Sequence, residues 1–469
     1  MDTEKASTRT ADGLSDAETE NLAANLRGQL LRPGMDGFDA ARRVWNAMID
    51  RTPALIARCA GAADVVHCVN FARYHGLPLS IRGGGHNVSG NAVCQGGLMI
   101  DLSPMRGIRV QPQRAIARAE AGCTWRDFDA ETQAFGLATT GGIIPTTGIA
   151  GLTLGGGLGW LMRKHGLSCD NLNSLDMVTA DGRLVTANAA ENAELFWAAR
   201  GGGGNFGVVT SFEFRVHPVG QVFGGMVAHS LERARDVLRF FRDFAVAAPD
   251  ELTPMAAFVT APDGSKILAI IVCYSGSLAE GERVLRPLRA FGSPLVDDIA
   301  PMPYLQLQSM LEPGFPPGQQ NYWKSNFLRE LSDDAIDILV EGFRNCPSAT
   351  SALAIEHLGG AVGRAKEDAT AFAHRKALFN LLIVGIWSNP VDNRRHTEWV
   401  RGLWEAMQPY SSGGVYVNYL GQSADEGLDR VRAAYGKANY ERLRALKHKF
   451  DPDNLFRLNQ NIDPQLRAA

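Results

Sequence analysis

The sequence predicts an α+β protein, and three observations lead to that fold class. The chain has 469 residues, which is enough for about three domain-sized units. Candidate strands and helices follow one another irregularly, so the regular strand–helix–strand crossovers of a parallel doubly wound sheet are not evident. Residues 83–207 contain 24 of the 50 glycines, where an even distribution would place about 13. One stretch of the chain therefore needs backbone without side chains.

Five segments carry helix signals. Ser15 and Glu18 have the spacing of a capping box, which predicts a helix near 15–30. The other predicted helices are 62–75 and 124–135, each followed by a glycine that ends it, then 190–199, and a charged amphipathic helix at 428–449.

Short apolar and β-branched runs predict strands in the same part of the chain. They lie at 78–82, 97–102, 107–110, 115–120 and 207–216. A hairpin is expected where the turn Ala180-Asp181-Gly182 joins strands at 174–180 and 183–187. Beyond Pro218 glycine becomes sparse, and longer helices and strands alternate up to residue 425.

Composition and charge exclude several classes of protein. Lys and Arg number 47 against 50 Asp and Glu, a net charge of −3, which argues against a nucleic-acid or anionic-membrane partner. The polar, acidic start has no apolar signal region, and no apolar run is long enough to span a membrane. The seven cysteines are odd in number and lack CxxC spacing, so we expect buried or reduced thiols and no metal site. A cytoplasmic protein is expected.

The first glycine cluster, IRGGGHN at 81–87, follows a predicted strand. Without Cβ atoms, successive backbone N–H groups can converge on an anion such as a pyrophosphate. No helix follows, so a backbone nest rather than a helix dipole would hold the anion. A lone histidine is more often structural, but His86 directly follows this loop and is a functional candidate.

Two further glycine clusters allow two interpretations each. The run at 146–160 could lie along a flat cofactor or form a closely packed turn. In GGGGNFG, Gly202, Gly204 and Gly207 match G-x-G-x-x-G, but the order is helix, glycine run, strand. A dinucleotide site of the Rossmann type needs strand, glycine turn, helix, so a nicotinamide-dependent dehydrogenase is rejected. Two interpretations of this glycine run are left: it forms a tight turn, or its backbone approaches a ligand closely.

Six motifs in register resemble those of the berberine bridge enzyme-like flavoproteins, within the vanillyl-alcohol oxidase superfamily. They are SIRGGGHNVSG, IDLSPMRGIRV, GIIPTTGIAGLTLGGGLGWLMRKHGLSCDNL, VTADGRLVTAN, ELFWAARGGGGNFGVVTSFEF and FDPDNLFRLNQNI. The resemblance covers residues 45–464 and is greatest to bacterial oxidases of secondary metabolism, such as the flavoenzyme that oxidises the enterocin polyketide. It implies a two-part FAD-binding domain of the p-cresol methylhydroxylase type and a substrate domain whose sheet covers the flavin.

The resemblance also implies how FAD is bound. The histidine of the first motif bonds covalently to the flavin 8α-methyl carbon in this family, and His86 holds that position. A neutral imidazole nitrogen is a suitable nucleophile for such a bond. The residues expected to bind FAD are Arg82, Gly83, Gly84, Gly85, His86, Asn87, Ser89, Gly90, Thr147, Gly148, Gly151, Gly155, Gly156, Gly157, Gly159, Trp160, Gly207, Val209, Asn418 and Asn459.

A second covalent link is not expected. Many relatives bond the flavin through a cysteine of a G-x-C-P-T-V-G motif, and here Ile144 stands at the cysteine position. In relatives, the residue at the position of Thr147 lines the access of oxygen to the flavin, and its identity varies. The choice between oxidase and dehydrogenase is therefore left open.

Tyr416 is the candidate catalytic residue, because Tyr416-Val417-Asn418-Tyr419 matches the family's Y-x-N-Y motif. In relatives the first tyrosine takes a hydroxyl proton while hydride passes to flavin N5. An ordinary tyrosine has a pKa of ~10 and needs help to act as a base near neutrality. Strand alternation would place Tyr416 and Asn418 on one face and Tyr419 on the other. A buried strand tyrosine is the alternative interpretation.

The resemblance implies three segments: 1–218 in the FAD-binding domain, 219–425 as the substrate domain, and 426–469 completing the FAD domain. No motif marks the substrate site. Its candidate residues are Tyr322, Lys324, Glu356, His357 and Trp387, of which adjacent Glu356 and His357 cannot both face one pocket of a strand.

The sequence therefore predicts an FAD-linked oxidoreductase with one histidyl bond and a small-molecule substrate, such as a secondary metabolite. It would oxidise a C–OH, C–N or activated C–H bond, with dioxygen as the acceptor. A flavin dehydrogenase with another acceptor and a non-catalytic flavin-bound protein are the alternatives. A homodimer is compatible with this interpretation.

Overall fold

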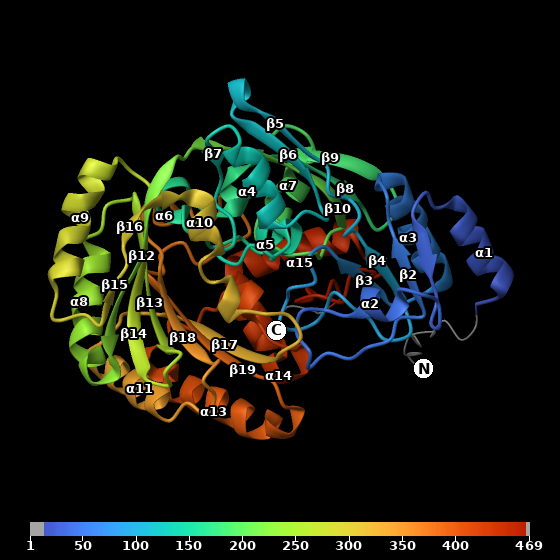
Figure 1. Ribbon diagram of the computed structural model, residues 1–469. Helices are drawn as coiled ribbons and strands as arrows, with labels where there is room; N and C mark the ends of the chain where they lie inside the picture. Colours follow the sequence, from blue (N-terminus) through green and yellow to red (C-terminus); the bar gives the residue numbers. More distant parts are fainter. Residues whose placement is uncertain (1–13, 466–469) are drawn as a thin grey trace.

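The fold is a mixture of helices and sheets, as the sequence predicted. The structure is a computed structural model that describes residues 14–465, so residues 1–13 of the polar start lie outside the described part. Figure 1 shows a large sheet with its helices on one side, two smaller sheets on the other, and the C-terminal helices between them.

The N-terminal sheet contains parallel strands that the sequence did not predict. Its order is β1 (Gln29–Leu31), β2 (Leu55–Arg58), β4 (Leu98–Asp101) and β3 (Leu79–Arg82). Strands β2 and β3 both pair in parallel with β4, and helix α3 (Ala62–His75) crosses from β2 to β3. This single crossover was not evident from the sequence, because a four-residue strand such as β2 is too short to show a period. Helix α3 ends at Gly76, as expected, in the left-handed conformation with φ 65°.

The middle sheet follows and holds the predicted hairpin. Its order is β5 (Ile108–Gln111), β6 (Ile116–Glu120), β10 (Val208–Arg215), β8 (Leu172–Val178) and β9 (Leu184–Asn188). The smaller elements of this half are α1 (Asp16–Asn25), α2 (Phe38–Arg42), α4 (Trp125–Gln133), β7 (Leu137–Ala138), α5 (Ile149–Leu154), α6 (Met162–His165), α7 (Ala193–Ala199) and β11 (His217–Pro218). The expected capping residue Ser15 bonds the first turn of α1, and Thr124 caps α4 in the same way.

The large sheet is antiparallel throughout. Its order is β15 (Val296–Asp297), β12 (Gln221–Ser230), β14 (Lys266–Tyr274), β13 (Leu252–Thr260), β18 (Ala352–His357), β19 (Phe379–Trp387) and β17 (Gln320–Leu328), with β16 (Ala300–Pro303) beside β12. Helices α8 (Ala234–Val246), α9 (Leu278–Ala290), α11 (Asp333–Arg344) and α13 (Asn393–Ala406) lie on its outer side in Figure 1. Short helices α10 (Tyr304–Ser309) and α12 (Gly360–Arg364) complete this half.

Side-chain alternation along β13 shows how this sheet separates two environments. Ala256 and Phe258 pack into the core formed with the outer helices. Met255 and Ala257 point the other way and pack with Trp160 of the N-terminal half. Because successive strand residues face opposite sides, the sheet buries both faces and turns one of them toward the N-terminal half.

The C-terminal segment contains two helices where the sequence predicted one over 428–449. Helix α14 spans Ser423–Tyr435 and α15 spans Lys437–Phe450. Gly436 separates them with φ 67°, a left-handed conformation that ends a helix and suits glycine. Helix α15 lies between the two halves of the molecule (Figure 1). Within residues 14–465, no helix combines the length and apolarity that crossing a membrane requires.

Candidate functional site

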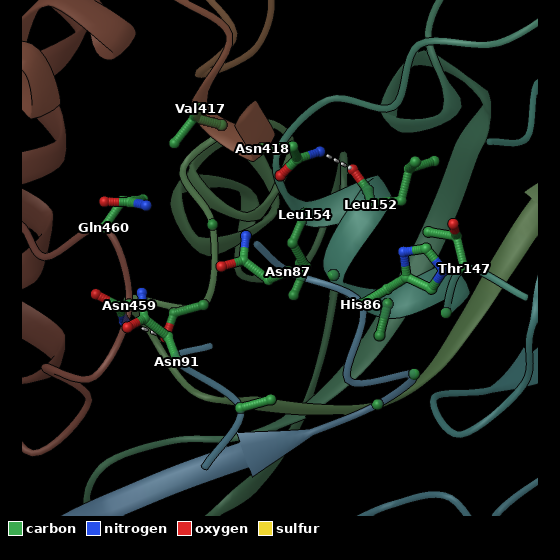
Figure 2. Close-up of a pocket in the computed structure, with 18 of the residues that line it drawn as sticks. His86, Asn87, Asn91, Thr147, Leu152, Leu154, Val417, Asn418, Asn459 and Gln460 are labelled. Carbon is green, nitrogen blue, oxygen red and sulfur yellow. Dashed lines mark hydrogen bonds between the residues drawn. The ribbon is translucent and has the colours of Figure 1, made fainter. Parts of the chain in front are cut away.

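The main cavity of the described residues lies between the N-terminal half and the large sheet. Its volume is about 290 Å³, near the lower end of the ~300–1,000 Å³ usual for ligand sites. Segments from the whole chain line it: 83–87, 142–144, 147–148, 150–152, 203–204, 207–209, 416–419 and 458–460, with Phe315, Trp323, Glu356 and Leu382 from the other half. Figure 2 shows His86 and Thr147 at one end and Asn91, Asn459 and Gln460 at the other.

The loop after β3 lines the cavity with bare backbone. Residues 83–87 all contact the cavity. Among the residues that the structure describes, none accepts a hydrogen bond from the backbone N–H groups of 83–87. Successive free N–H groups in a glycine loop form a concavity that suits an anion. Since no Lys or Arg of residues 14–465 lines the cavity, backbone donors would carry that role.

His86 is held rigidly at the cavity wall. Its ring stacks on Trp45 with centroids 4.6 Å apart and an angle of 17° between the planes. Its Nε2 hydrogen-bonds with Thr146 Oγ1 at 3.1 Å. Burial lowers the pKa of His86 to about 4, so the imidazole is neutral at pH 7. A neutral, oriented imidazole can act as a nucleophile.

The second glycine loop packs directly against the first. A Cβ at Gly84 would lie 2.4 Å from the backbone nitrogen of Gly148, and a Cβ at Gly148 would lie 2.4 Å from that of Gly84. Thr147, Gly148 and Gly151 line the cavity. Ile144, at the position where relatives have the linking cysteine, also lines it. All seven cysteines are buried elsewhere, and none contacts the cavity.

The later glycines of this cluster pack against protein instead. Gly155, Gly156, Gly157 and Gly159 do not line the cavity. A Cβ on Gly155 would lie 2.0 Å from Asn418 Oδ1, and one on Gly159 would lie 1.8 Å from the Gly141 carbonyl oxygen. Trp160 is buried beneath the large sheet. This end of the cluster therefore fits the closely packed turn that the sequence left open.

Three expected FAD residues of the first loop lie behind it. Arg82, Ser89 and Gly90 are absent from the cavity lining. The Arg82 guanidinium donates to the Ala41 carbonyl, and the Ser89 hydroxyl donates to Asn87. They hold the shape of the loop. In the third glycine cluster, Gly207 and the following Val209 do line the cavity.

The oxygen of Tyr416 is surrounded by donors. The N–H groups of Gly157 and Leu158 donate to it at 3.0 and 3.3 Å, and Asn418 Nδ2 donates at 2.7 Å. Burial raises the pKa of Tyr416, and these donors oppose that rise. The expected strand alternation was wrong, because residues 417–419 form a 3₁₀ turn. The turn brings Tyr416, Asn418 and Tyr419 to the cavity together.

Glu356 is the one carboxylate that lines the cavity within residues 14–465. Its side chain is buried at the end of β18. The Tyr419 hydroxyl donates to Oε1 at 2.9 Å, and Asn380 Nδ2 donates to Oε2 at 2.7 Å. Burial raises the pKa of Glu356, against the effect of these two hydrogen bonds.

The remaining substrate candidates lie away from the main cavity. Tyr322 and Lys324 share the opposite face of β17, where the Tyr322 hydroxyl donates to Asp425 at 2.6 Å and Lys324 pairs with the same carboxylate at 2.7 Å. His357 Nδ1 accepts a hydrogen bond from the Arg163 guanidinium at 2.9 Å, and Trp387 stacks on His396.

The residues present fit FAD at both ends of the cavity. The free N–H groups of 83–87 suit a diphosphate, and the glycine contact at 84 and 148 keeps side chains out of its way. At the far end, Asn459 Oδ1 and Gln460 Oε1 are buried without a protein partner. Buried acceptors of this kind need a donor, which hydroxyl or N–H groups of the cofactor would supply.

Sequence reasoning missed several lining or supporting residues. Trp45, which stacks on His86, stands in a segment without a motif. Trp323 lines the cavity, whereas the substrate residues predicted from the sequence were its neighbours Tyr322 and Lys324. Along β17, Trp323 lies on one face and its two neighbours lie on the other, but the sequence carried no signal for which face meets the cavity. Tyr419 was visible in the Y-x-N-Y motif and was assigned to the wrong face.

Comparison with known proteins agrees with this site. A family profile described as FAD binding domain matches residues 53–188, and one described as berberine and berberine like matches residues 415–463. An FAD-linked oxidoreductase of Dictyostelium discoideum is 32% identical over 445 residues, covering 94% of this chain and 95% of that protein. The (R)-6-hydroxynicotine oxidase of Paenarthrobacter nicotinovorans is 32% identical over 455 residues, covering 94% and 98%.

Among solved structures, 6-hydroxy-D-nicotine oxidase from Arthrobacter nicotinovorans matches with a TM-score of 0.87 and 30% identity. The match covers 94% of this chain and 98% of that chain. Sequence and fold thus agree over nearly the whole length. The chain therefore belongs to the berberine bridge enzyme-like family of FAD-linked oxidoreductases.

Proposed function

We propose that this oxidoreductase is an oxidase whose FAD is covalently bound through His86 alone. It oxidises a C–OH, C–N or activated C–H bond of a small molecule and uses dioxygen as the acceptor. One observation carries the proposal: free backbone N–H groups at 83–87 line the cavity beside a neutral, immobilised histidine. The oxidase name of the relative from Paenarthrobacter nicotinovorans supports dioxygen as the acceptor.

Bound FAD supplies the two-electron acceptor for this reaction. Residues of the chain would bind and position this cofactor. The loop 83–87 would hold the diphosphate, and His86, whose ring Trp45 and Thr146 hold in place, would be the residue linked to the flavin 8α-methyl group. Ile144 offers no nucleophile at the second position, so one link forms.

Tyr416 is the proposed proton acceptor for the substrate. Three N–H donors point at its oxygen, which is more than a neutral phenol accommodates beside its own proton. The arrangement stabilises negative charge on that oxygen. The backbone of Gly157 and Leu158 therefore helps a buried tyrosine to act as a base.

The covalent link is tested by denaturing the purified protein in SDS and following flavin fluorescence with the chain. The wild-type chain should stay fluorescent, and His86→Ala should release all its flavin. His448→Ala, an exposed histidine on α15, is the matched control and should behave as the wild type. Flavin that stays on the denatured His86→Ala chain, or that leaves the denatured wild-type chain, would contradict a covalent bond at His86.

The acceptor is tested separately by stopped-flow mixing of the reduced protein with dioxygen. An oxidase should be reoxidised much faster than free reduced flavin in the same buffer. A rate no faster than that of free flavin would instead favour a dehydrogenase with another acceptor.

A further inference from the structure

Residues 313–318 form a short stretch between α10 and β17, which we call the proline segment. Its sequence is PGFPPG, and its three prolines have no backbone N–H to donate. Every residue of the segment except Phe315 is exposed. The N–H groups of Gly314 and Phe315 bond only within the adjoining turn, to the carbonyls of 311 and 312. The segment therefore depends on other parts of the chain to hold it in place.

Trp45 supplies that support. Its indole Nε1 donates to the Phe315 carbonyl at 3.2 Å, and the Gly318 N–H donates to the Trp45 carbonyl at 3.1 Å. Within residues 14–465, these two hydrogen bonds are the ones that join the proline segment to the N-terminal half. One residue, 268 positions before the segment in the sequence, thus fixes its position.

The same indole ring supports the cofactor side of the cavity. Trp45 is 6% exposed and lies behind the cavity wall rather than in it. Its face stacks on the His86 imidazole, and its backbone N–H donates to the Gly85 carbonyl at 3.0 Å. A buried indole N–H needs an acceptor, and its acceptor is the Phe315 carbonyl. Because one rigid ring makes both contacts, the positions of His86 and Phe315 depend on each other.

The two residues that follow in the chain hold the start of β17 instead. Asn46 Nδ2 donates to the Asn321 carbonyl at 2.9 Å, and the Ala47 N–H donates to the Gln319 carbonyl at 2.9 Å. Both acceptors lie beyond the proline segment. Removal of the Trp45 side chain should therefore free Phe315 while the strand itself remains attached.

Phe315 is the residue of the proline segment that lines the cavity. Its ring meets Trp323 edge-to-face with centroids 6.4 Å apart, and Trp323 meets Trp45 in the same way at 5.5 Å. Trp323 also lines the cavity. Trp45 therefore lies behind two walls of the cavity, one that carries His86 and one that carries Phe315.

We infer that Trp45 is a positioning residue that sets His86 and Phe315 together, on opposite sides of the same cavity. The inference rests on the proposed function, because it takes His86 as the residue that is linked to the flavin. The ring face orients the imidazole for that link, and the ring N–H keeps the proline segment against the cavity. A shift of about 1 Å in a reacting group can slow a reaction about 10²-fold, so loss of the ring face should impair the link.

Two substitutions separate the two contacts. Trp45→Phe keeps an aromatic face against His86 but has no N–H for the Phe315 carbonyl, whereas Trp45→Leu loses both. The purified proteins are denatured in SDS, and the flavin that stays with the chain is compared with the flavin that is released. Trp45→Phe should keep its flavin as the wild type does. Trp45→Leu should bind flavin and release more than half of it.

Hydrogen–deuterium exchange of the flavin-loaded proteins reports the second contact. Peptides that cover the proline segment should exchange about 2- to 10-fold faster in both Trp45 variants, as expected for the loss of one hydrogen bond. Peptides from β12 are the reference and should exchange as in the wild type. A chain that was only less stable overall would exchange faster in both places.

Trp197 provides the matched control. It is 5% exposed, and its Nε1 donates to the Asp368 carbonyl at 2.7 Å, so it also joins two distant parts of the chain. Neither of these residues lines the cavity. Trp197→Phe and Trp197→Leu should keep the flavin linked and leave exchange in the proline segment unchanged.

The outcomes separate this inference from the proposed function. A wild-type chain that releases its flavin in SDS would overturn the proposed function. With a linked wild-type chain, the inference alone is overturned if Trp45→Leu releases no more flavin than Trp197→Leu, or if Trp45→Phe releases as much as Trp45→Leu. Exchange in the proline segment of Trp45→Phe that matches the wild type would also overturn it, and this measurement decides the matter even if Trp45→Leu does not fold.

Discussion

At the scale of single residues, the oxygen of Tyr416 occupies an unusual position. It accepts from two backbone N–H groups and from Asn418, while its ring is 1% exposed. Burial favours the neutral phenol, and the three donors favour the phenolate. Removing only this hydroxyl should therefore affect the reaction more than the fold.

Tyr416→Phe should lower the rate of flavin reduction by roughly 10²- to 10⁴-fold, the usual contribution of a general base. The measurement is anaerobic stopped-flow reduction with a substrate found by flavin bleaching. Tyr322→Phe removes a hydroxyl from the face of β17 that lies away from the cavity, and should retain the rate. A full rate in Tyr416→Phe would exclude this tyrosine as the base.

At the scale of elements, two loops from different parts of the N-terminal half meet without side chains. The contact between Gly84 and Gly148 leaves no space for a Cβ on either residue. Inserting a methyl group into such a contact typically costs about 1–3 kcal/mol and displaces backbone. Because both loops line the cavity, the displacement would reach the proposed FAD site.

Gly148→Ala should therefore lower both the unfolding midpoint and the amount of flavin bound per chain. The flavin-to-protein absorbance ratio and a thermal melt measure these two effects. Gly402→Ala is the control, because a Cβ there meets no atom within 4 Å and α13 is helical; alanine there is favoured by ~1 kcal/mol. Full flavin content in Gly148→Ala would show that the loop contact does not shape the site.

At the scale of the whole molecule, several histidines are buried in the neutral form. Burial lowers the pKa of His86 and His217 to about 4 and that of His165 and His357 to about 3. Below pH 6.5 the unfolded chain protonates these groups and the folded chain does not, so stability falls with falling pH. Asp129, whose pKa burial raises to about 7, acts in the opposite direction, as does Glu356.

The histidines outnumber the carboxyls, so the free energy of unfolding should fall by at least about 1.4 kcal/mol per pH unit between pH 6.5 and 5. Urea denaturation at pH 7.0 and 5.5 measures this. The imidazoles of His165 and His217 stack with their centroids 3.8 Å apart. Replacing both with glutamine, His165→Gln and His217→Gln, should remove part of the pH dependence, because two groups with lowered pKa values are then lost. Stability that is constant or rises on acidification would contradict this account.

Much of the fold was predictable because its signals are local. The helix over 62–75, the hairpin of β8 and β9, and the capping box at Ser15 depend on residues within a few positions of one another. The parallel pairing of β2 and β3 with β4 was not predictable, since it depends on which short strands meet in space. The break at Gly436 was a local signal that the amphipathic pattern on either side obscured.

The sequence by itself determined the α+β class, the family, the glycine loop that leads into His86, and the absence of a cysteine at Ile144. The fold class follows from the order of elements along the chain, and the other three are carried by contiguous motifs. Only the tertiary structure decided which side chains meet at the cavity. Glu356 and Tyr419 are 63 residues apart, and Trp45 reaches His86 from outside any motif. Alternation divides the residues of a strand between two faces, but packing against the other half decides which face binds the ligand.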